Sequence, residues 1–220
     1  MTGSAPLEPL AGPPRLNELA PQFRARSTRG IINLSDYRGR WLVFFSHPAD
    51  FTPVCTSELI GFARVEPRFK VLGCDLLALS VDSLYAHLAW VRAIQDRFGV
   101  SISFPIVEDV SMVIARAYGM MHPRATDNST VRSTFVIDPE GLIRASLHYP
   151  MSTGRMVGEV LRLVEALKLS DEDGVVTPEG WQPGGQVFDP APQNLDDAGH
   201  AFDADQDWYY RLHDQRPRTA

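Results

Sequence analysis

The stretch S-H-P-A-D-F-T-P-V-C-T-S-E-L, residues 46–59, decides how this part of the chain folds. It follows W-L-V-F-F, residues 41–45, a short apolar run that predicts a buried strand. Thr52 is a favoured N-cap, and Pro53 then occupies the first helical position, where its missing N–H costs nothing. Cys55 comes two residues later. The stretch therefore predicts a strand, a proline-braced turn, and a helix with a cysteine in its first turn.

The position of Cys55 favours a reactive thiol. N–H groups in a first helical turn lack intrahelical partners, and the positive end of the helix dipole favours thiolate over thiol. We expect the Thr52 hydroxyl to bond to the first-turn backbone or to the sulfur, and Pro48 and Pro53 to restrict the loop. The local residues leave one alternative open, a well-capped helix with a small buried residue at position 55.

The first 170 residues alternate between apolar runs and segments of helical periodicity. The segments expected as strands are 41–45, 72–82, 103–109 and the two halves of 133–149, which are joined by D-P-E-G at 138–141. The segments expected as helices are 52–69, 83–99, 111–120 and 155–169. This order predicts an α/β protein with a thioredoxin-like fold, a mixed central sheet flanked by helices on both faces.

Charge and proline content change near residue 170. Residues 1–170 hold 18 basic and 16 acidic side chains, whereas residues 171–220 hold 3 basic and 11 acidic ones and five of the 17 prolines. We therefore expect a thioredoxin-like domain over 6–170 and an extended C-terminal arm over 171–220. Because the arm carries D-W-Y-Y-R at 207–211, we expect these aromatics to dock, either on a partner subunit or on the arm's own domain.

Composition argues against several classes of function. The net charge of −6 disfavours a general nucleic-acid-binding surface, and no apolar run is long enough to span a membrane. Two cysteines and an N-terminus without the apolar core of a secretion signal predict a reducing compartment, the cytoplasm. We expect no cofactor and no metal, because there is no phosphate-binding glycine loop, no C-x-x-C and no metal-ligand spacing among the histidines outside the loop. These histidines are His87, His122, His148, His200 and His213.

Two residues of the expected helix 83–99 are predicted to lie in different environments, one at an interface and one in the core. We expect His87 at an interface and Trp90 in the core.

Residues 48–55, P-A-D-F-T-P-V-C, fit the P-x-x-x-[T/S]-x-x-C signature of the peroxiredoxins, which are thiol peroxidases. The longer form at 46–58 resembles the one-cysteine subfamily and its archaeal relatives. Further matching segments follow in the same order at 80–90, 104–109, 130–141, 149–155 and 207–210. The resemblance spans roughly residues 6–215 and implies the thioredoxin-like fold.

The resemblance also implies roles for residues of the loop and of the segment T-V-R-S-T-F. Cys55 matches the cysteine that attacks the terminal oxygen of a hydroperoxide and becomes a sulfenic acid. Thr52 matches the hydroxyl that holds the peroxide, and Pro48 the residue that shields the sulfur. Arg132 matches the arginine that stabilises the thiolate and polarises the peroxide.

Three more residues match supporting positions around the substrate. Arg155 matches a second arginine of the site, His47 a subfamily residue beside the pocket, and Glu58 a residue that orients the arginines. The implied reaction is reduction of hydrogen peroxide and organic hydroperoxides, in antioxidant defence and redox homeostasis. The alternative is a redox-regulated chaperone or peroxide sensor on the same assembly.

The second cysteine predicts how the enzyme is regenerated. Cys74 lies in the apolar run 72–82, so we expect inert packing in the core rather than a resolving thiol. Arg211 follows the aromatic cluster where some archaeal relatives have a cysteine. We therefore expect a one-cysteine cycle with an external thiol reductant such as thioredoxin or glutathione. The resemblance implies a homodimer with an exchanged arm, and a decamer of five dimers.

Overall fold

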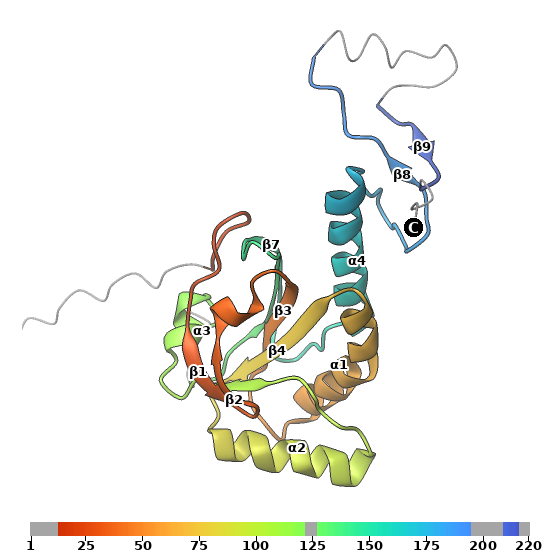
Figure 1. Ribbon diagram of the computed structural model, residues 1–220. Coiled ribbons are helices and arrows are strands. Elements are labelled where there is room, and N and C mark those ends of the chain that lie inside the picture. The colour runs from red at the N-terminus through yellow and green to blue at the C-terminus, as the bar shows by residue number, and fades with distance from the viewer. Residues whose placement is uncertain (1–12, 122–126, 195–208, 216–220) are drawn as a thin grey trace, which may run out of the picture. The chain divides into compact units, whose positions relative to one another are not determined.

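A computed structural model describes residues 13–121, 127–194 and 209–215 of the chain (Figure 1). By its internal contacts the chain divides into two compact units, Met1–Val157 and Gly158–Ala220. The expected boundary at residue 170 stays a prediction, and in this division helix α4 (Val157–Asp173) belongs almost entirely to the second unit.

A seven-stranded mixed sheet forms the first unit, in the order β2-β1-β5-β4-β3-β6-β7. The strands are β1 Arg24–Ser27, β2 Gly30–Asn33, β3 Trp41–Ser46, β4 Cys74–Ser80, β5 Ile106–Glu108, β6 Arg132–Ile137 and β7 Ile143–Tyr149. The central strands β3, β4 and β5 are parallel, and the outer pairs are antiparallel. The helical segments that connect them are η1 Leu34–Tyr37, α1 Pro53–Val71, α2 Leu84–Phe98 and α3 Val113–Ala117.

The expected thioredoxin-like arrangement is confirmed, because helices cover both faces of the sheet. Side chains of β3 alternate between the faces: Phe44 packs against Tyr118, which follows α3, whereas Phe45 stacks on Phe62 of α1 at 4.1 Å. Figure 1 shows α1 and α3 on opposite sides of β3 and β4. Strand β3 is buried along its whole length and is therefore a rigid support for the loop that follows it.

The helix ends follow the sequence signals. Thr52 occupies the N-cap position of α1 with Pro53 as the first helical residue, and the Ser83 side chain caps α2 by accepting from the Ala86 N–H. Gly99 ends α2 in the left-handed conformation, with φ 66°. These ends place Cys55 at the third position of α1, as predicted.

The N-terminal hairpin β1–β2 was missed by the sequence analysis. Its segments R-A-R-S and G-I-I-N are short, and most of their residues are exposed or half-buried. Their periodicity is therefore weak, and tertiary pairing of Ser27 with Val107 of β5 holds them in the sheet.

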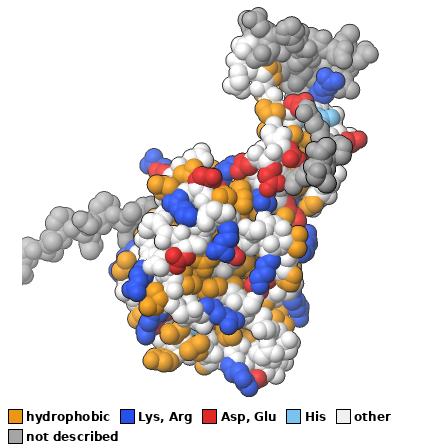
Figure 2. Space-filling model, viewed as in Figure 1, with side chains coloured by type: hydrophobic (Ala, Val, Ile, Leu, Met, Phe, Trp, Pro, Cys, Tyr) orange, Lys and Arg blue, Asp and Glu red, His pale blue; other side chains and the backbone are white. Residues whose placement is uncertain are grey.

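The second unit contains α4 and a two-stranded sheet of β8 (Val187–Phe188) and β9 (Leu212–His213). It has a small hydrophobic cluster of its own, made of Ala166, Leu169, Val175, Trp181 and Val187. Figure 2 shows acidic side chains gathered on this part of the chain, and basic side chains interspersed with hydrophobic ones on the first unit. The expected aromatic cluster lies partly outside the described residues. Of its described members, Tyr210 packs on Phe188, and both Tyr209 and Tyr210 are exposed.

None of the helices in the described ranges has the length and apolar character needed to cross a membrane.

Candidate active site

The loop between β3 and α1 carries the cysteine into a buried position. Pro48 is buried, and Phe51 adopts a left-handed conformation with φ 56°, which is uncommon for a non-glycine residue. The turn ends at Thr52, and Cys55 follows with only 1% of its surface exposed. The Phe51 ring packs on Trp90, with ring centroids 6.3 Å apart, and a strained residue of this kind is typical of functional turns.

Thr52 does not bond as the sequence predicted. Its hydroxyl donates to the Ala49 carbonyl oxygen at 2.8 Å, and no side-chain bond caps the helix, so the expected bond to the first-turn backbone or to the sulfur is wrong. The first intrahelical bond runs from the Thr56 N–H to the Thr52 carbonyl. The N–H groups of Val54 and Cys55 therefore have no acceptor within the helix and remain available to a bound oxygen.

Arg132 contacts the sulfur directly. Its Nη1 donates to Cys55 Sγ at 3.3 Å, and its Nε and Nη2 both donate to the Met151 carbonyl oxygen. Arg132 is the first residue of β6 and is 2% exposed. The Met151 carbonyl binds one edge of the guanidinium, and Nη1 on the other side contacts the sulfur, so the position of the guanidinium relative to the sulfur is fixed.

Strand pairing explains why Arg132 reaches the site. The Ser46 hydroxyl donates to the Val131 carbonyl and accepts from the Ser133 N–H, so it bonds the backbone on both sides of Arg132. The register of β3 and β6 pairs Phe45 with Thr134. The end of β3, where the cysteine loop begins, is thereby fixed beside the start of β6.

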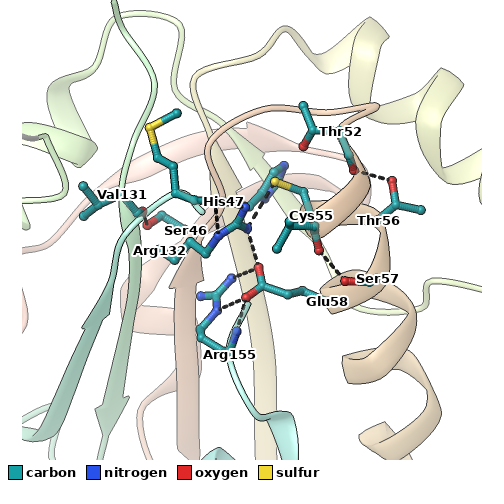
Figure 3. A network of polar contacts seen from close by, with 12 residues as sticks. Ser46, His47, Thr52, Cys55, Thr56, Ser57, Glu58, Val131, Arg132 and Arg155 are labelled. Carbon is teal, nitrogen blue, oxygen red and sulfur yellow. Dashed lines mark hydrogen bonds and ion pairs between the residues drawn. The ribbon is translucent and has the colours of Figure 1, made fainter. Parts of the chain in front are cut away.

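Glu58 joins the two arginines one helical turn after Cys55 (Figure 3). Its Oε2 accepts from Arg132 Nη1 and Arg155 Nη2, each at 2.7 Å, and its Oε1 accepts from the Arg155 backbone N–H and Nε. Burial by itself would raise the pKa of Glu58, but the hydrogen bonds and charge of Arg155, with the charge of Arg132, lower the pKa below its ordinary value. Glu58 is therefore an ionised carboxylate that orients both arginines.

The buried charges favour an anion at the sulfur. Arg132, Arg155 and Glu58 are all nearly inaccessible and together carry one excess positive charge. A thiolate at Cys55 would cancel it, which matters because an unpaired buried charge is costly. Arg155 is further held by the rings of Phe45 and Phe62, 5.1 and 5.7 Å from its guanidinium carbon.

The site also contains a histidine that the sequence analysis placed elsewhere. His87, expected at an interface, is fully buried, and its Nδ1 lies 2.7 Å from Asp50 Oδ2. The other oxygen of Asp50 lies 2.8 Å from His47 Nε2. Forty residues separate the two histidines, so sequence spacing gave no signal for this cluster. Trp90 is buried as expected.

One nitrogen of each histidine and the Asp50 carboxylate lie within 4.8 Å of one another, a separation that a metal ion could bridge. His47 Nε2 and His87 Nδ1 are each hydrogen-bonded to the Asp50 carboxylate, and these two bonds account for the arrangement without an ion.

Cys74 lies far from Cys55 along the sheet. It is buried at the first position of β4, paired with Trp41, whereas Cys55 follows the other end of β3. Five strand steps correspond to roughly 16 Å, and no disulfide joins the two cysteines in the described part of the chain. A bridge between them would therefore need extensive unfolding.

Comparison with known proteins agrees with this geometry. The family model described as "AhpC/TSA family" matches residues 16–146, and "C-terminal domain of 1-Cys peroxiredoxin" matches residues 166–199. The chain belongs to the peroxiredoxin family. Peroxiredoxin of Aquifex aeolicus is 48% identical over 82% of each chain, and peroxiredoxin 2 of Picrophilus torridus is 42% identical over 90% of this chain and 98% of its own.

Solved peroxiredoxins share the fold. The yeast mitochondrial 1-Cys peroxiredoxin superposes with a TM-score of 0.79 at 40% identity, over 88% of this chain and 96% of its own. Peroxiredoxin 6 of Arenicola marina gives 0.77 at 35% identity, over 86% and 89%. This peroxiredoxin is a thiol peroxidase with an antioxidant role, and the comparisons do not favour the alternative of a chaperone.

Proposed function

We propose that Cys55 is the peroxidatic cysteine and that Arg132 is its main electrostatic partner. The observation that supports this most directly is the contact of 3.3 Å between Arg132 Nη1 and Cys55 Sγ, inside a buried cluster with one excess positive charge. The thiolate attacks the terminal oxygen of a hydroperoxide, an S–O bond forms, and the O–O bond breaks. Sulfur is oxidised to sulfenic acid, and the departing oxygen takes a proton to leave as water or alcohol.

The proposed roles of the other residues follow from their contacts. The Thr52 hydroxyl donates to Ala49, so its oxygen is left to accept the O–H of the peroxide. The backbone N–H of Cys55 and the guanidinium of Arg132 stabilise the negative charge that develops on the leaving oxygen. Glu58 and Arg155 keep Arg132 in place, and the buried Pro48 shields the sulfur from water.

A mass measurement after one equivalent of hydrogen peroxide tests the proposal. We expect one added oxygen on Cys55, no disulfide, and complete loss of peroxide consumption in Cys55→Ser. Cys74→Ser is the matched control, because it removes the other buried thiol at the opposite end of β3 and should retain single-turnover reduction. Catalytic peroxide consumption by Cys55→Ser would overturn the assignment.

We further propose that the substrates are hydrogen peroxide and organic hydroperoxides and that an external thiol regenerates the enzyme. The far position of Cys74 supports an external reductant, and the yeast relative is described with glutathione/thioredoxin systems. Thioredoxin or glutathione is therefore the proposed reductant here, and a cycle that consumes reduced thiol suits the cytoplasm. Dimers with exchanged arms, closing into a decamer, are the proposed assembly.

A further inference from the structure

A buried chain of three polar side chains lies behind the cysteine loop. Asp50 bonds His47 through one carboxylate oxygen and His87 through the other, and all three side chains are at most 2% exposed. Asp50 and His47 belong to the loop and the end of β3, whereas His87 lies in α2. A charged group enclosed in this way is stable only if its hydrogen bonds are complete.

The carboxylate fixes which ring nitrogen carries the proton. Burial would raise the pKa of Asp50, but the hydrogen bonds and charges of His47 and His87 lower the pKa below its ordinary value, so Asp50 is an acceptor only. His47 must therefore donate through Nε2 and His87 through Nδ1. The remaining nitrogens, His47 Nδ1 and His87 Nε2, are buried without a hydrogen-bond partner among the described residues.

The same chain connects α2 to the reactive loop. The Asp50 backbone N–H donates to Asp82, and the His47 carbonyl accepts from the buried Thr130, two residues before Arg132. The His47 ring also packs against Trp90 of α2, with ring centroids 5.2 Å apart. Asp50 is thus held on both its backbone and its side chain, two residues before Thr52.

The surrounding charged groups come from the connection between β4 and α2 and from the strands β5 and β6. Asp82, between β4 and α2, also accepts from Ser80, and Glu108 of β5 accepts from the Leu84 N–H at the start of α2. Arg132 of β6 follows Thr130. Asp82 and Glu108 have donors of their own, which leaves Asp50 as the carboxylate that bonds the two imidazoles.

We propose that Asp50 and His87 are positioning residues for peroxide reduction, which hold His47 in one tautomer and orientation and fix the loop that carries Thr52. This proposal rests on the proposed peroxidase role of Cys55. Neither residue contacts the sulfur, and both act through His47 and the loop. The sequence motif contains Asp50 but does not contain His87, which reaches the site only through the packing of α2.

Two substitutions of His87 test the proposal. An asparagine at position 87 can place an N–H near the position of the imidazole Nδ1, whereas leucine keeps apolar volume without a donor. We expect His87→Leu and Asp50→Asn to slow oxidation of Cys55 by hydrogen peroxide by about 10- to 100-fold, with His87→Asn within about threefold of the unaltered protein. Stopped-flow rate constants between pH 5 and 8 should also show a changed pH profile for His87→Leu and Asp50→Asn, because both substitutions remove a hydrogen bond between an imidazole and the Asp50 carboxylate.

A purely structural role would lower the melting temperature without changing the pH profile of the rate constant. Unchanged rates and pH profiles in His87→Leu and Asp50→Asn would overturn the proposal. If those variants do not fold, ¹⁵N chemical shifts of the unaltered protein decide: a protonated His47 Nε2 with an unprotonated Nδ1 supports the proposal, and the opposite tautomer overturns it. Both readouts use protein with Cys55 intact, so they are independent of the Cys55→Ser result that tests the peroxidase assignment.

Discussion

At the scale of single residues, the site depends on a carboxylate that two arginines share. The Glu58 carboxylate accepts hydrogen bonds from both Arg132 and Arg155, and Arg132 also donates to the sulfur of Cys55. Removal of Glu58 leaves two buried guanidinium groups without their carboxylate, which costs more than an ion pair itself contributes. Stability and reactivity are therefore coupled in this cluster.

Replacing Arg132 with lysine should slow Cys55 oxidation while keeping a positive charge. Lysine has its donors on one nitrogen at the end of a flexible stem, and it cannot bond the sulfur, Glu58 and the Met151 carbonyl together as the planar guanidinium of Arg132 does. We expect the second-order rate constant with hydrogen peroxide to fall about 100- to 1,000-fold, the cost of losing one oxyanion donor. Stopped-flow fluorescence measures it, and a rate constant within threefold of the parent would contradict the role assigned to the guanidinium.

Replacing Glu58 with glutamine should lower the free energy of unfolding at neutral pH by about 3–5 kcal/mol, because two buried guanidinium groups lose their counter-ion. The lowered pKa of Glu58 also gives the unaltered protein a contribution to stability that is present above the ordinary value of 4.5 and is lost as pH falls through the folded pKa. Urea denaturation below pH 4.5 should therefore show a shallower loss of stability in Glu58→Gln. Equal slopes in both proteins would argue against an ionised Glu58.

At the scale of elements, helix ends and strand ends place the chemistry. The start of α1 at Pro53 sets the third helical position of Cys55, and the end of β3 faces the start of β6. Helix α2 has no residue in the signature, yet it supplies His87 and Trp90 behind the loop. The site is therefore built from the end of β3, the starts of α1 and β6, the segment after β7, and the face of α2 that carries His87 and Trp90.

Replacing Ser83 with alanine separates the stability of α2 from its role in the site. The Ser83 hydroxyl accepts from the Ala86 N–H, and loss of an N-cap costs about 1 kcal/mol. We expect this decrease in urea denaturation, with the rate of Cys55 oxidation unchanged because the contacts of His87 remain. A large fall in the rate would mean that α2 fails to hold its position without the cap.

At the scale of the whole molecule, the second unit has an apolar cluster around Trp181 and exposes Tyr209 and Tyr210. Exposed tyrosines next to each other suit the proposed exchange of arms between subunits. Replacing both with serine should leave the Trp181 cluster intact and shift the protein to a lighter species in analytical ultracentrifugation. Val71→Ser, at another strongly exposed apolar position, is the control. An unchanged mass in the double variant would contradict the proposed interface.

The sequence by itself determined the strand–turn–helix around Cys55, the order of the main elements, and the one-cysteine signature, because these depend on local periodicity, caps and turn residues. It missed the hairpin β1–β2, whose short and mostly exposed strands have weak periodicity. Only the tertiary structure decided that the Thr52 hydroxyl bonds to Ala49 and that His87 bonds to Asp50, which also bonds to His47. It also decided that Cys74, in β4, lies beside the end of β3 that is far from Cys55. These facts depend on contacts between residues brought together by strand pairing and helix packing, which no local pattern encodes.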